Sequence, residues 1–199
     1  MRILFSTGKR SVGGPAIFID RDGVINCRRA DDYVLDWSQF VFMPDIRKAL
    51  RDLSSLQLPM IVISNQSAVG RGLLTPATLQ DMTAQMQKTL LNDGVCLTAV
   101  YFCTHAPAEG CPCRKPKPGL LHAAAADFNI DLSRSIFIGD SNTDIEAARA
   151  AGCQPVLFGP GLNPSSDQLD WVKGLPIALT GRELFGVVHS RMRNRRKLS

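Results

Sequence analysis

Residues 15–26 read PAIFIDRDGVIN, in which four apolar residues lead directly into the sequence DRDG. A short, continuously apolar run is typical of a strand that is buried on both faces of a parallel sheet. Asp20 and Asp22 are two residues apart, so their side chains face the same side of an extended chain. Gly23 then allows the chain to turn sharply. The stretch therefore predicts a central strand that ends in a pair of carboxylates.

Similar apolar runs alternate with helical patterns along the rest of the chain. The runs are MIVI (60–63), AVYF (99–102), SIFI (135–138) and PVLF (155–158). The helical patterns follow Pro44-Asp45 and Thr75-Pro76, and occupy LLHAAAADF (120–128) and TDIEAARAA (143–151). This alternation predicts an α/β fold, a doubly wound (Rossmann-like) parallel sheet with helices on both faces. Near the C-terminus we expect a short strand at Trp171-Val172 and a final helix over 176–189.

Polar segments follow four of the apolar runs, where ligands bind in such sheets. These segments are Asp20–Gly23, Ser64–Ser67, Arg114–Gly119 and Gly139–Asp144. Each alone has an ordinary explanation as a turn, a loop or a helix cap, but together they indicate a functional site. Converging carboxylates raise one another's pKa, and a divalent cation removes that repulsion. Hard oxygen ligands favour Mg²⁺. Lys115 and Lys117 are both candidates for binding a phosphate.

The motifs FIDRDGVI, VISNQS, CRKPKPG and FIGDSNTD resemble those of the haloacid dehalogenase (HAD) superfamily of phosphatases, over about residues 15–160. The resemblance implies that Asp20 is the nucleophile and forms a covalent aspartyl-phosphate. Asp22 would protonate the leaving group and then deprotonate the attacking water. Mg²⁺ would be bound by the Asp20 carboxylate, the Asp22 backbone carbonyl and Asp140, with Asp144 helping through water. A carboxylate suits this role because it is already ionised at neutral pH.

The same resemblance implies which residues bind the substrate. Ser64 and Lys115 would hold the transferring phosphoryl group, and Lys115 is preferred over Lys117 because family members with the C-R-K-P motif use that lysine. A cation and a lysine together neutralise charge as the phosphoryl group moves. The remaining expected substrate contacts are Asn65, Gln66, Ser67 and Arg114.

Four potential metal ligands crowd into a short segment in the pattern C-x-H…C-x-C: Cys103, His105, Cys111 and Cys113. Three thiolates and one imidazole suit a tetrahedral Zn²⁺, and four protein ligands leave no open position for catalysis. We therefore expect a structural, zinc-bound loop that also positions Lys115; the alternative is a loop of free thiols. The other cysteines are expected to be small core residues: Cys27, Cys96 and Cys153.

The zinc loop before C-R-K-P resembles the branch of the superfamily that acts on heptose bisphosphate and on histidinol phosphate. It implies removal of the 7-phosphate of D-glycero-D-manno-heptose 1,7-bisphosphate, with histidinol phosphate or another small phosphorylated metabolite as the alternative substrate. This chain differs from the heptose enzymes of that branch in two places. Ser141 replaces a lysine that often contacts substrate in the heptose enzymes, and CRRADD (27–32) lacks the usual His-Gly. Arg28 or Arg29 is a candidate for binding a second phosphate.

The segments between the motifs are filled by the elements already assigned, which leaves no room for a separate cap domain. We expect a flexible basic N-terminal extension over 1–14, one phosphatase domain over 15–190 and a flexible basic tail over 191–199. An arm that binds nucleic acid is the alternative for that tail. The net charge of +5 and the pI of 9.0 reflect these ends rather than a basic binding face.

Composition also limits the function classes. The hydrophobic share of 45% is ordinary for a globular protein, and no apolar run reaches the roughly 18 residues that a membrane helix needs. We expect no secretory signal and a cytoplasmic, monomeric enzyme. A polynucleotide 3′-phosphatase needs a broad basic groove, and a non-enzymatic zinc module has no use for Asp20, Asp22, Lys115 and Asp140 together.

Overall fold

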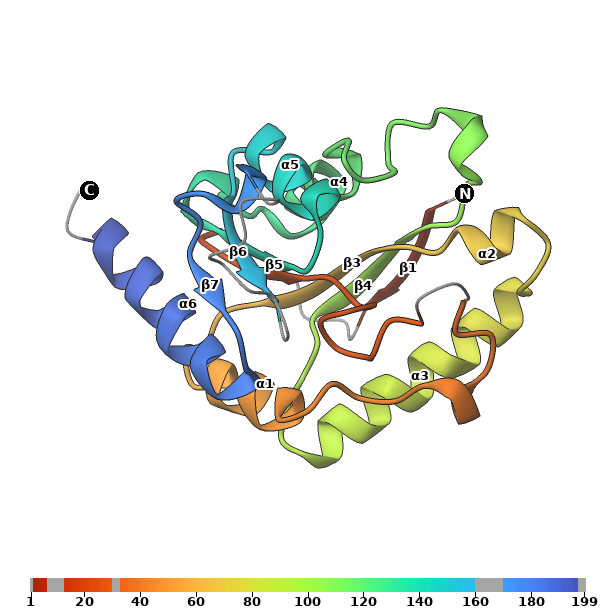
Figure 1. The fold of residues 1–199 in the computed structure, drawn as a ribbon, viewed down its shortest axis with the longest axis horizontal. Coiled ribbons are helices and arrows are strands. Elements are labelled where there is room, and N and C mark those ends of the chain that lie inside the picture. Colours follow the sequence, from red (N-terminus) through yellow and green to blue (C-terminus); the bar gives the residue numbers. More distant parts are fainter. Residues whose placement is uncertain (1, 7–12, 30–32, 160–169, 197–199) are drawn as a thin grey trace.

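A seven-stranded sheet forms the centre of the computed structural model, which describes residues 2–6, 13–29, 33–159 and 170–196 (Figure 1). The strand order is β1-β4-β3-β2-β5-β6-β7. The mutually parallel strands are β2 (Ile17–Ile19), β3 (Met60–Asn65), β4 (Ala99–Cys103), β5 (Ile136–Gly139), β6 (Gln154–Phe158) and β7 (Ile177–Ala178). This confirms the predicted doubly wound α/β sheet, with β2 at its centre.

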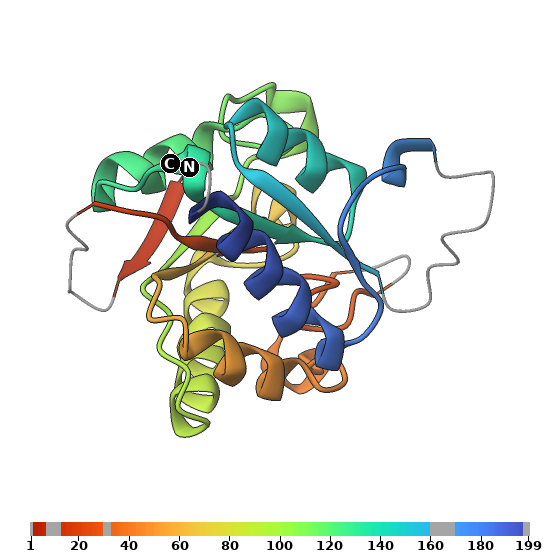
Figure 2. The same cartoon turned by 90° about the vertical axis from the view of Figure 1, so that its left-hand side faces the viewer.

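Helices cover both faces of the sheet (Figures 1 and 2). One face packs against α1 (Ile46–Ser54), α3 (Pro76–Asn92) and α6 (Gly181–Arg196). The other packs against α4 (Gly119–Phe128) and α5 (Asn142–Ala150). A short α2 (Ser67–Gly70) follows β3. Between β2 and β4, the described connections contain only α1, α2, α3 and the 3₁₀ turn at Trp37–Gln39, and the connection from β4 to α4 contains only the 3₁₀ turn at Pro107–Glu109. These described segments therefore form no separate cap domain.

Strand β2 shows how the sequence builds this core. Ile17 and Ile19 face the α1–α3–α6 side, and Phe18 faces the α4–α5 side, because successive side chains of a strand alternate. All three are fully buried. Helix α3 begins as expected: the Thr75 side chain accepts a hydrogen bond from the Thr78 backbone amide, and Pro76 is the first helical residue.

Both ends of the chain differ from the prediction. Residues Arg2–Ser6 form the edge strand β1, which pairs antiparallel with β4, because the open edge of β4 offers backbone partners to an extended segment. Residues 7–12 of the predicted extension lie outside the described part. Helix α6 continues to Arg196, so most of the predicted flexible tail is helical. The short strand pairs at Ile177–Ala178, where β6 has a free edge, and Asp170–Val172 is a 3₁₀ turn instead.

A membrane-spanning helix is not found in the described part of the chain: none of its helices combines the length and the hydrophobicity that crossing a bilayer requires.

Candidate active site and metal-binding loop

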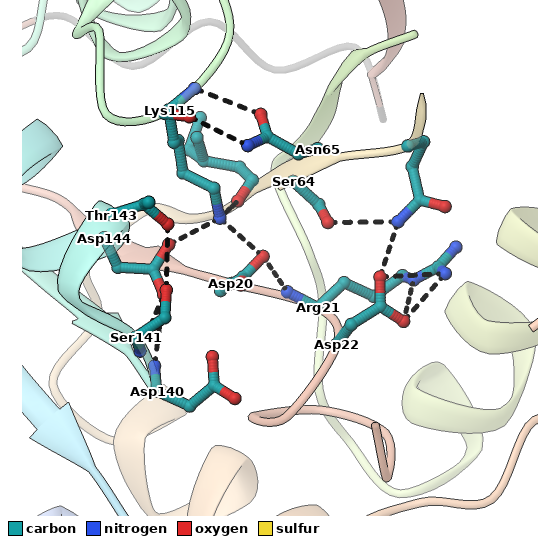
Figure 3. Close-up of polar contacts among 12 residues, drawn as sticks. Asp20, Arg21, Asp22, Ser64, Asn65, Lys115, Asp140, Ser141, Thr143 and Asp144 are labelled. Carbon is teal, nitrogen blue, oxygen red and sulfur yellow. Dashed lines mark hydrogen bonds and ion pairs between the residues drawn. The ribbon is translucent and has the colours of Figure 1, made fainter. Parts of the chain in front are cut away.

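Lys115 lies at the centre of a buried charge cluster beyond the carboxyl ends of β2, β3 and β5 (Figure 3). Its Nζ is 2.8 Å from Asp20 Oδ1 and 2.7 Å from Asp144 Oδ1, and it donates to the Ile63 carbonyl at 3.1 Å. Oδ1 of Asp20 also accepts a hydrogen bond from the Arg21 backbone amide at 2.7 Å. The carboxylate that follows β2 is therefore held in one orientation by two donors.

Three acidic side chains converge around this lysine. Carboxylate oxygens of Asp20, Asp140 and Asp144 lie within 4.8 Å of one another. Burial raises the pKa of Asp20 to about 6, even though Lys115 opposes the shift. Burial, together with the charge of Asp20, raises the pKa of Asp140 to about 7. A divalent cation held by these oxygens would relieve the repulsion, and an all-carboxylate donor set suits Mg²⁺.

Asp144 differs from the other two carboxylates. Burial alone raises its pKa, but the Lys115 cation and hydrogen bonds from Ser141 outweigh it and leave the pKa below its ordinary value. Its Oδ2 accepts from the Ser141 hydroxyl at 2.6 Å and from the backbone amides of Asp140 and Ser141. Asp144 thus fixes Lys115 and the start of α5.

Gly23 lets the loop after β2 approach Asp140 closely. Its φ of +90° is unfavourable for other residues, and a Cβ atom there would lie 1.8 Å from Asp140 Oδ2. The glycine therefore brings the first and fourth motifs together.

Asp22 is held by three polar side chains. Arg21 Nη2 lies 2.8 Å from its Oδ1, Asn26 Nδ2 donates to the same oxygen at 2.9 Å, and Gln66 Nε2 donates to Oδ2 at 2.6 Å. Burial alone raises the pKa of Asp22, but the Arg21 charge and these hydrogen bonds lower it below its ordinary value. These contacts therefore hold Asp22 in its ionised form at neutral pH.

Arg21 and Asn26 are contacts that the sequence analysis missed. Arg21 is buried, and its guanidinium lies 5.9 Å from the ring centroids of both Phe40 and Phe102. A cation buried between aromatic rings and paired with a carboxylate acts as a rigid support. The arginine inside DRDG was the available signal, but adjacent residues in an extended strand are expected to face opposite ways.

The segment after β3 contributes side chains with separate tasks. Ser64 is buried, and its Oγ accepts from Gln66 Nε2 at 3.1 Å, so Gln66 links Ser64 to Asp22. The Asn65 amide makes two hydrogen bonds of 3.1 Å with the backbone N and O of Lys115. Asn65 therefore positions Lys115 with its side-chain amide, and its expected contact with substrate stays a prediction. Ser67 Oγ lies 3.4 Å from the Tyr33 hydroxyl.

The two lysines of the third motif are distinguished by their contacts. Lys117 is exposed, and its Nζ donates to the Gly110 carbonyl at 2.6 Å, away from the carboxylates. Lys115 is the lysine that lies within the cluster. The neighbouring Arg114 is half-buried, and its Nη1 is covered by protein without a hydrogen-bond partner.

The four predicted zinc ligands come together in one cluster. Cys103 Sγ lies 3.5 Å from both Cys111 Sγ and His105 Nδ1, and Cys113 Sγ lies 3.4, 3.4 and 3.3 Å from Cys103 Sγ, Cys111 Sγ and His105 Nδ1. A tetrahedral zinc with bonds of about 2.3 Å needs ligand atoms roughly 3.8 Å apart. Burial raises the pKa of the Cys103 thiol to about 12, so a cation is needed to hold it as a thiolate. The geometry and the donor set fit Zn²⁺.

This metal-binding loop, residues 103–113, is tied to the active site at both ends. The backbone amide of Gln66 donates to the Cys103 carbonyl at 2.7 Å. At the other end, a Cβ on Gly119, the first residue of α4, would lie 2.4 Å from the Pro112 carbonyl oxygen. The loop thus packs against the start of α4. Lys115 lies between the loop and α4 in the sequence.

The remaining cysteines only partly follow the prediction. Cys153 is buried and Cys27 is half-buried, but Cys96 is exposed. Its neighbours Val95 and Leu97 are both buried, so alternation along the chain turns Cys96 toward solvent.

Comparison with known proteins places this chain among phosphatases. The family model for HAD-hydrolase-like proteins matches residues 112–174. The D-glycero-β-D-manno-heptose-1,7-bisphosphate 7-phosphatase of Pseudomonas aeruginosa is 39% identical over 145 residues, which cover 73% of this chain and 81% of that protein. The protein of the same name from Escherichia coli K12 is 35% identical over 169 residues, covering 79% and 87%.

Solved structures agree. The D,D-heptose 1,7-bisphosphate phosphatase of Bordetella bronchiseptica, solved with magnesium and phosphate, has a TM-score of 0.77 at 29% identity and covers 88% of this chain and 98% of that one. A HAD-like phosphatase from Mesorhizobium loti has a TM-score of 0.78 at 26% identity, covering 96% and 93%.

Proposed function

This chain belongs to the HAD-like family of D-glycero-β-D-manno-heptose-1,7-bisphosphate 7-phosphatases, and from that membership we propose that it removes the 7-phosphate of this sugar through an aspartyl-phosphate on Asp20. The observation that carries the proposal is the buried cluster in which Lys115 holds Asp20 beside Asp140. An oriented carboxylate next to a buried lysine and a cation-binding group is what phosphoryl transfer to a side chain requires.

The proposed reaction has two displacements at phosphorus. In the first, an Asp20 oxygen attacks the 7-phosphoryl group, the bond to the sugar oxygen breaks, and Asp22 donates a proton to that oxygen. In the second, water attacks the aspartyl-phosphate, gives a proton to Asp22 and releases inorganic phosphate. The ionised state of Asp22 favours the second role, and Asp22 must take up a proton before the first.

Ser64 and Lys115 are proposed to bind the transferring phosphoryl oxygens. Ser64 Oγ is already oriented by Gln66, and Lys115 is already beside the nucleophile. Arg114, which is half-buried, is proposed to bind another part of the substrate with its guanidinium. Gln66 is proposed to act by orienting Asp22 and Ser64, and Ser67 to lie beside the substrate.

Mg²⁺ is proposed to be held by the carboxylates of Asp20 and Asp140 and the backbone carbonyl of Asp22, where it supplies charge neutralisation for the transferring phosphoryl group. The structure that was solved with magnesium and phosphate supports this choice. Asp144 is engaged with Lys115 and three donors, so we assign it to support rather than to the metal. Zn²⁺ is proposed as a structural ion on Cys103, His105, Cys111 and Cys113.

Magnesium affinity should depend on pH because protons compete for the same carboxylates. The pKa of Asp20 is raised to about 6 and that of Asp140 to about 7, so both are largely ionised at pH 8 and largely protonated near pH 5.5. We expect the dissociation constant for Mg²⁺, measured by calorimetry, to rise about twentyfold between pH 8 and pH 6. Without the cation, the same shifts make the free energy of unfolding fall as pH rises from about 4 to about 7. A magnesium affinity independent of pH over this range would contradict the assigned ligands.

The substrate is tested by comparing two phosphate esters side by side. We expect kcat/KM for heptose 1,7-bisphosphate to exceed that for histidinol phosphate by at least about a hundredfold, because a site built to bind a polar group rejects an analogue that lacks it. The relatives support the heptose substrate. Ser141 is weaker support for the heptose substrate, because it stands where the heptose enzymes often have a substrate-contacting lysine. Its hydroxyl donates a hydrogen bond to Asp144. A reversed preference would assign the chain to histidinol phosphate instead.

All of the active-site contacts described above come from residues 15–190, which we propose as the catalytic domain. We also propose a cytoplasmic enzyme that acts as a monomer on this small sugar phosphate, with no nucleic-acid partner.

A further inference from the structure

Arg28 lies at the open edge of the active site, against two groups that the proposed Mg²⁺ also needs. Its Nη2 is 2.8 Å from Asp140 Oδ1 and 3.5 Å from the backbone carbonyl oxygen of Asp22. The other Asp140 oxygen, Oδ2, faces the backbone of Gly23. Arg28 therefore contacts the carboxylate oxygen of Asp140 that is turned away from the Gly23 loop.

Arg28 is well suited to move. Its side chain is 52% exposed, whereas that of Asp140 is 16% exposed. An exposed arginine–carboxylate pair is weak, because water screens the charges and the long side chain loses freedom when it is held. A divalent cation carries twice the charge and binds oxygens at closer range. Two cations cannot comfortably share Asp140 Oδ1 and the Asp22 carbonyl, so binding of Mg²⁺ should displace the guanidinium.

The displaced guanidinium would remain at the mouth of the site. By contrast, Lys115 and Arg21 are buried and paired with carboxylates, and Lys117 is bound to a loop carbonyl. Arg114 is also proposed to contact the substrate, but it is half-buried and its Nη1 is covered by protein. A planar guanidinium matches a phosphate group with two parallel hydrogen bonds. In a bisphosphate, the phosphate that is not hydrolysed is such a group, and it lies on the part of the substrate that is away from Asp20.

We propose that Arg28 is a specificity-determining residue: it pairs with Asp140 until a divalent cation takes that carboxylate, and it then binds the unhydrolysed phosphate of the substrate. This inference rests on the proposed function, because a monophosphate carries no second group for Arg28 to bind. Loading of the metal and recognition of the second phosphate are thereby coupled through one side chain.

The first test measures magnesium binding by calorimetry in the absence of substrate. Arg28→Gln should bind Mg²⁺ about two- to fivefold more tightly than the wild type, since a competing exposed ion pair has been removed. Arg182→Gln is the matched control, because Arg182 is also an exposed arginine paired with an aspartate, Asp45, outside the active site. Its magnesium affinity should equal that of the wild type. Equal affinities in all three proteins would overturn the proposed competition.

The second test compares kcat/KM for heptose 1,7-bisphosphate with that for heptose 7-phosphate, at saturating Mg²⁺. Arg28→Gln should lower the ratio about tenfold or more, mainly through KM for the bisphosphate, because a charge-assisted contact is lost. Arg28→Lys should restore part of the ratio, and Arg182→Gln should leave it unchanged. An unchanged ratio in Arg28→Gln would overturn this inference alone. A wild type that hydrolyses neither sugar would overturn the proposed function and this inference with it.

Discussion

Asp20→Asn is expected to lower kcat by at least about three orders of magnitude, since removal of a nucleophile typically costs that much or more. The amide has nearly the same shape, so it can keep the hydrogen bond from the Arg21 backbone amide, but it cannot form the acyl phosphate that water then hydrolyses. The fold should survive, because the substitution removes one of several mutually repelling charges that raise the pKa values of this cluster.

Steady-state kinetics and thermal unfolding check this expectation together. Asp81→Asn provides the control, because Asp81 is an exposed aspartate of α3. It should leave both kcat and Tm unchanged. An Asp20→Asn protein that is folded and retains more than about one per cent of wild-type kcat would contradict a covalent role for Asp20.

Cys111→Ser is expected to cause the largest loss of stability among the substitutions considered. It leaves two thiolates and an imidazole for zinc, and the binding energy of a structural zinc is largely folding energy. We expect a fall in Tm of roughly 5–10 °C, which corresponds to a few kcal/mol in a domain of this size. Lys115 lies close behind the loop in sequence, so kcat should also fall, although Asp20 and its metal ligands are untouched.

Cys96→Ser is the matched control for the metal-binding loop, because Cys96 is exposed and lies outside the cluster. Elemental analysis should find about one zinc per chain in the wild type and in Cys96→Ser, and less in Cys111→Ser. A wild type without zinc, under conditions that retain zinc in a known zinc protein, would contradict the assignment. So would a Cys111→Ser protein as stable as Cys96→Ser.

The central strands and their motifs could be predicted because their signal is local. A buried parallel strand must be apolar on both faces, so the run before Asp20 was recognisable. The polar segments after such strands meet at one edge of the sheet for topological reasons. This reasoning correctly brought Asp20, Lys115 and Asp140 together from segments far apart in the sequence.

The edge strand and the final helix could not be predicted in the same way. Whether Arg2–Ser6 extend or remain unpaired depends on the free edge of β4, which no local pattern reveals. The basic residues at the end of the chain indicate exposure, and an exposed segment can equally well be the last turns of a helix such as α6.

The direction in which individual side chains point is the second feature that could not be predicted from the sequence. The sequence predicted Asn65 near the substrate, but only the tertiary structure shows that its side-chain amide makes two hydrogen bonds with the Lys115 backbone. The contact of Arg28 with Asp140 likewise joins residues that are 112 positions apart, through a loop with no regular periodicity. Such contacts depend on which way a loop turns, and the sequence gives the residue type without the direction.

The most direct test of the account is to trap the phosphorylated enzyme. Borohydride reduces an acyl phosphate to an alcohol, so an enzyme quenched during turnover with heptose 1,7-bisphosphate and Mg²⁺ should carry homoserine in place of Asp20, as read by peptide mass spectrometry. The conversion should disappear when Mg²⁺ is omitted and in the Asp20→Asn protein. Steady release of phosphate with Asp20 unmodified at every quench time, or reduction at a different carboxylate, would contradict a reaction that proceeds through Asp20.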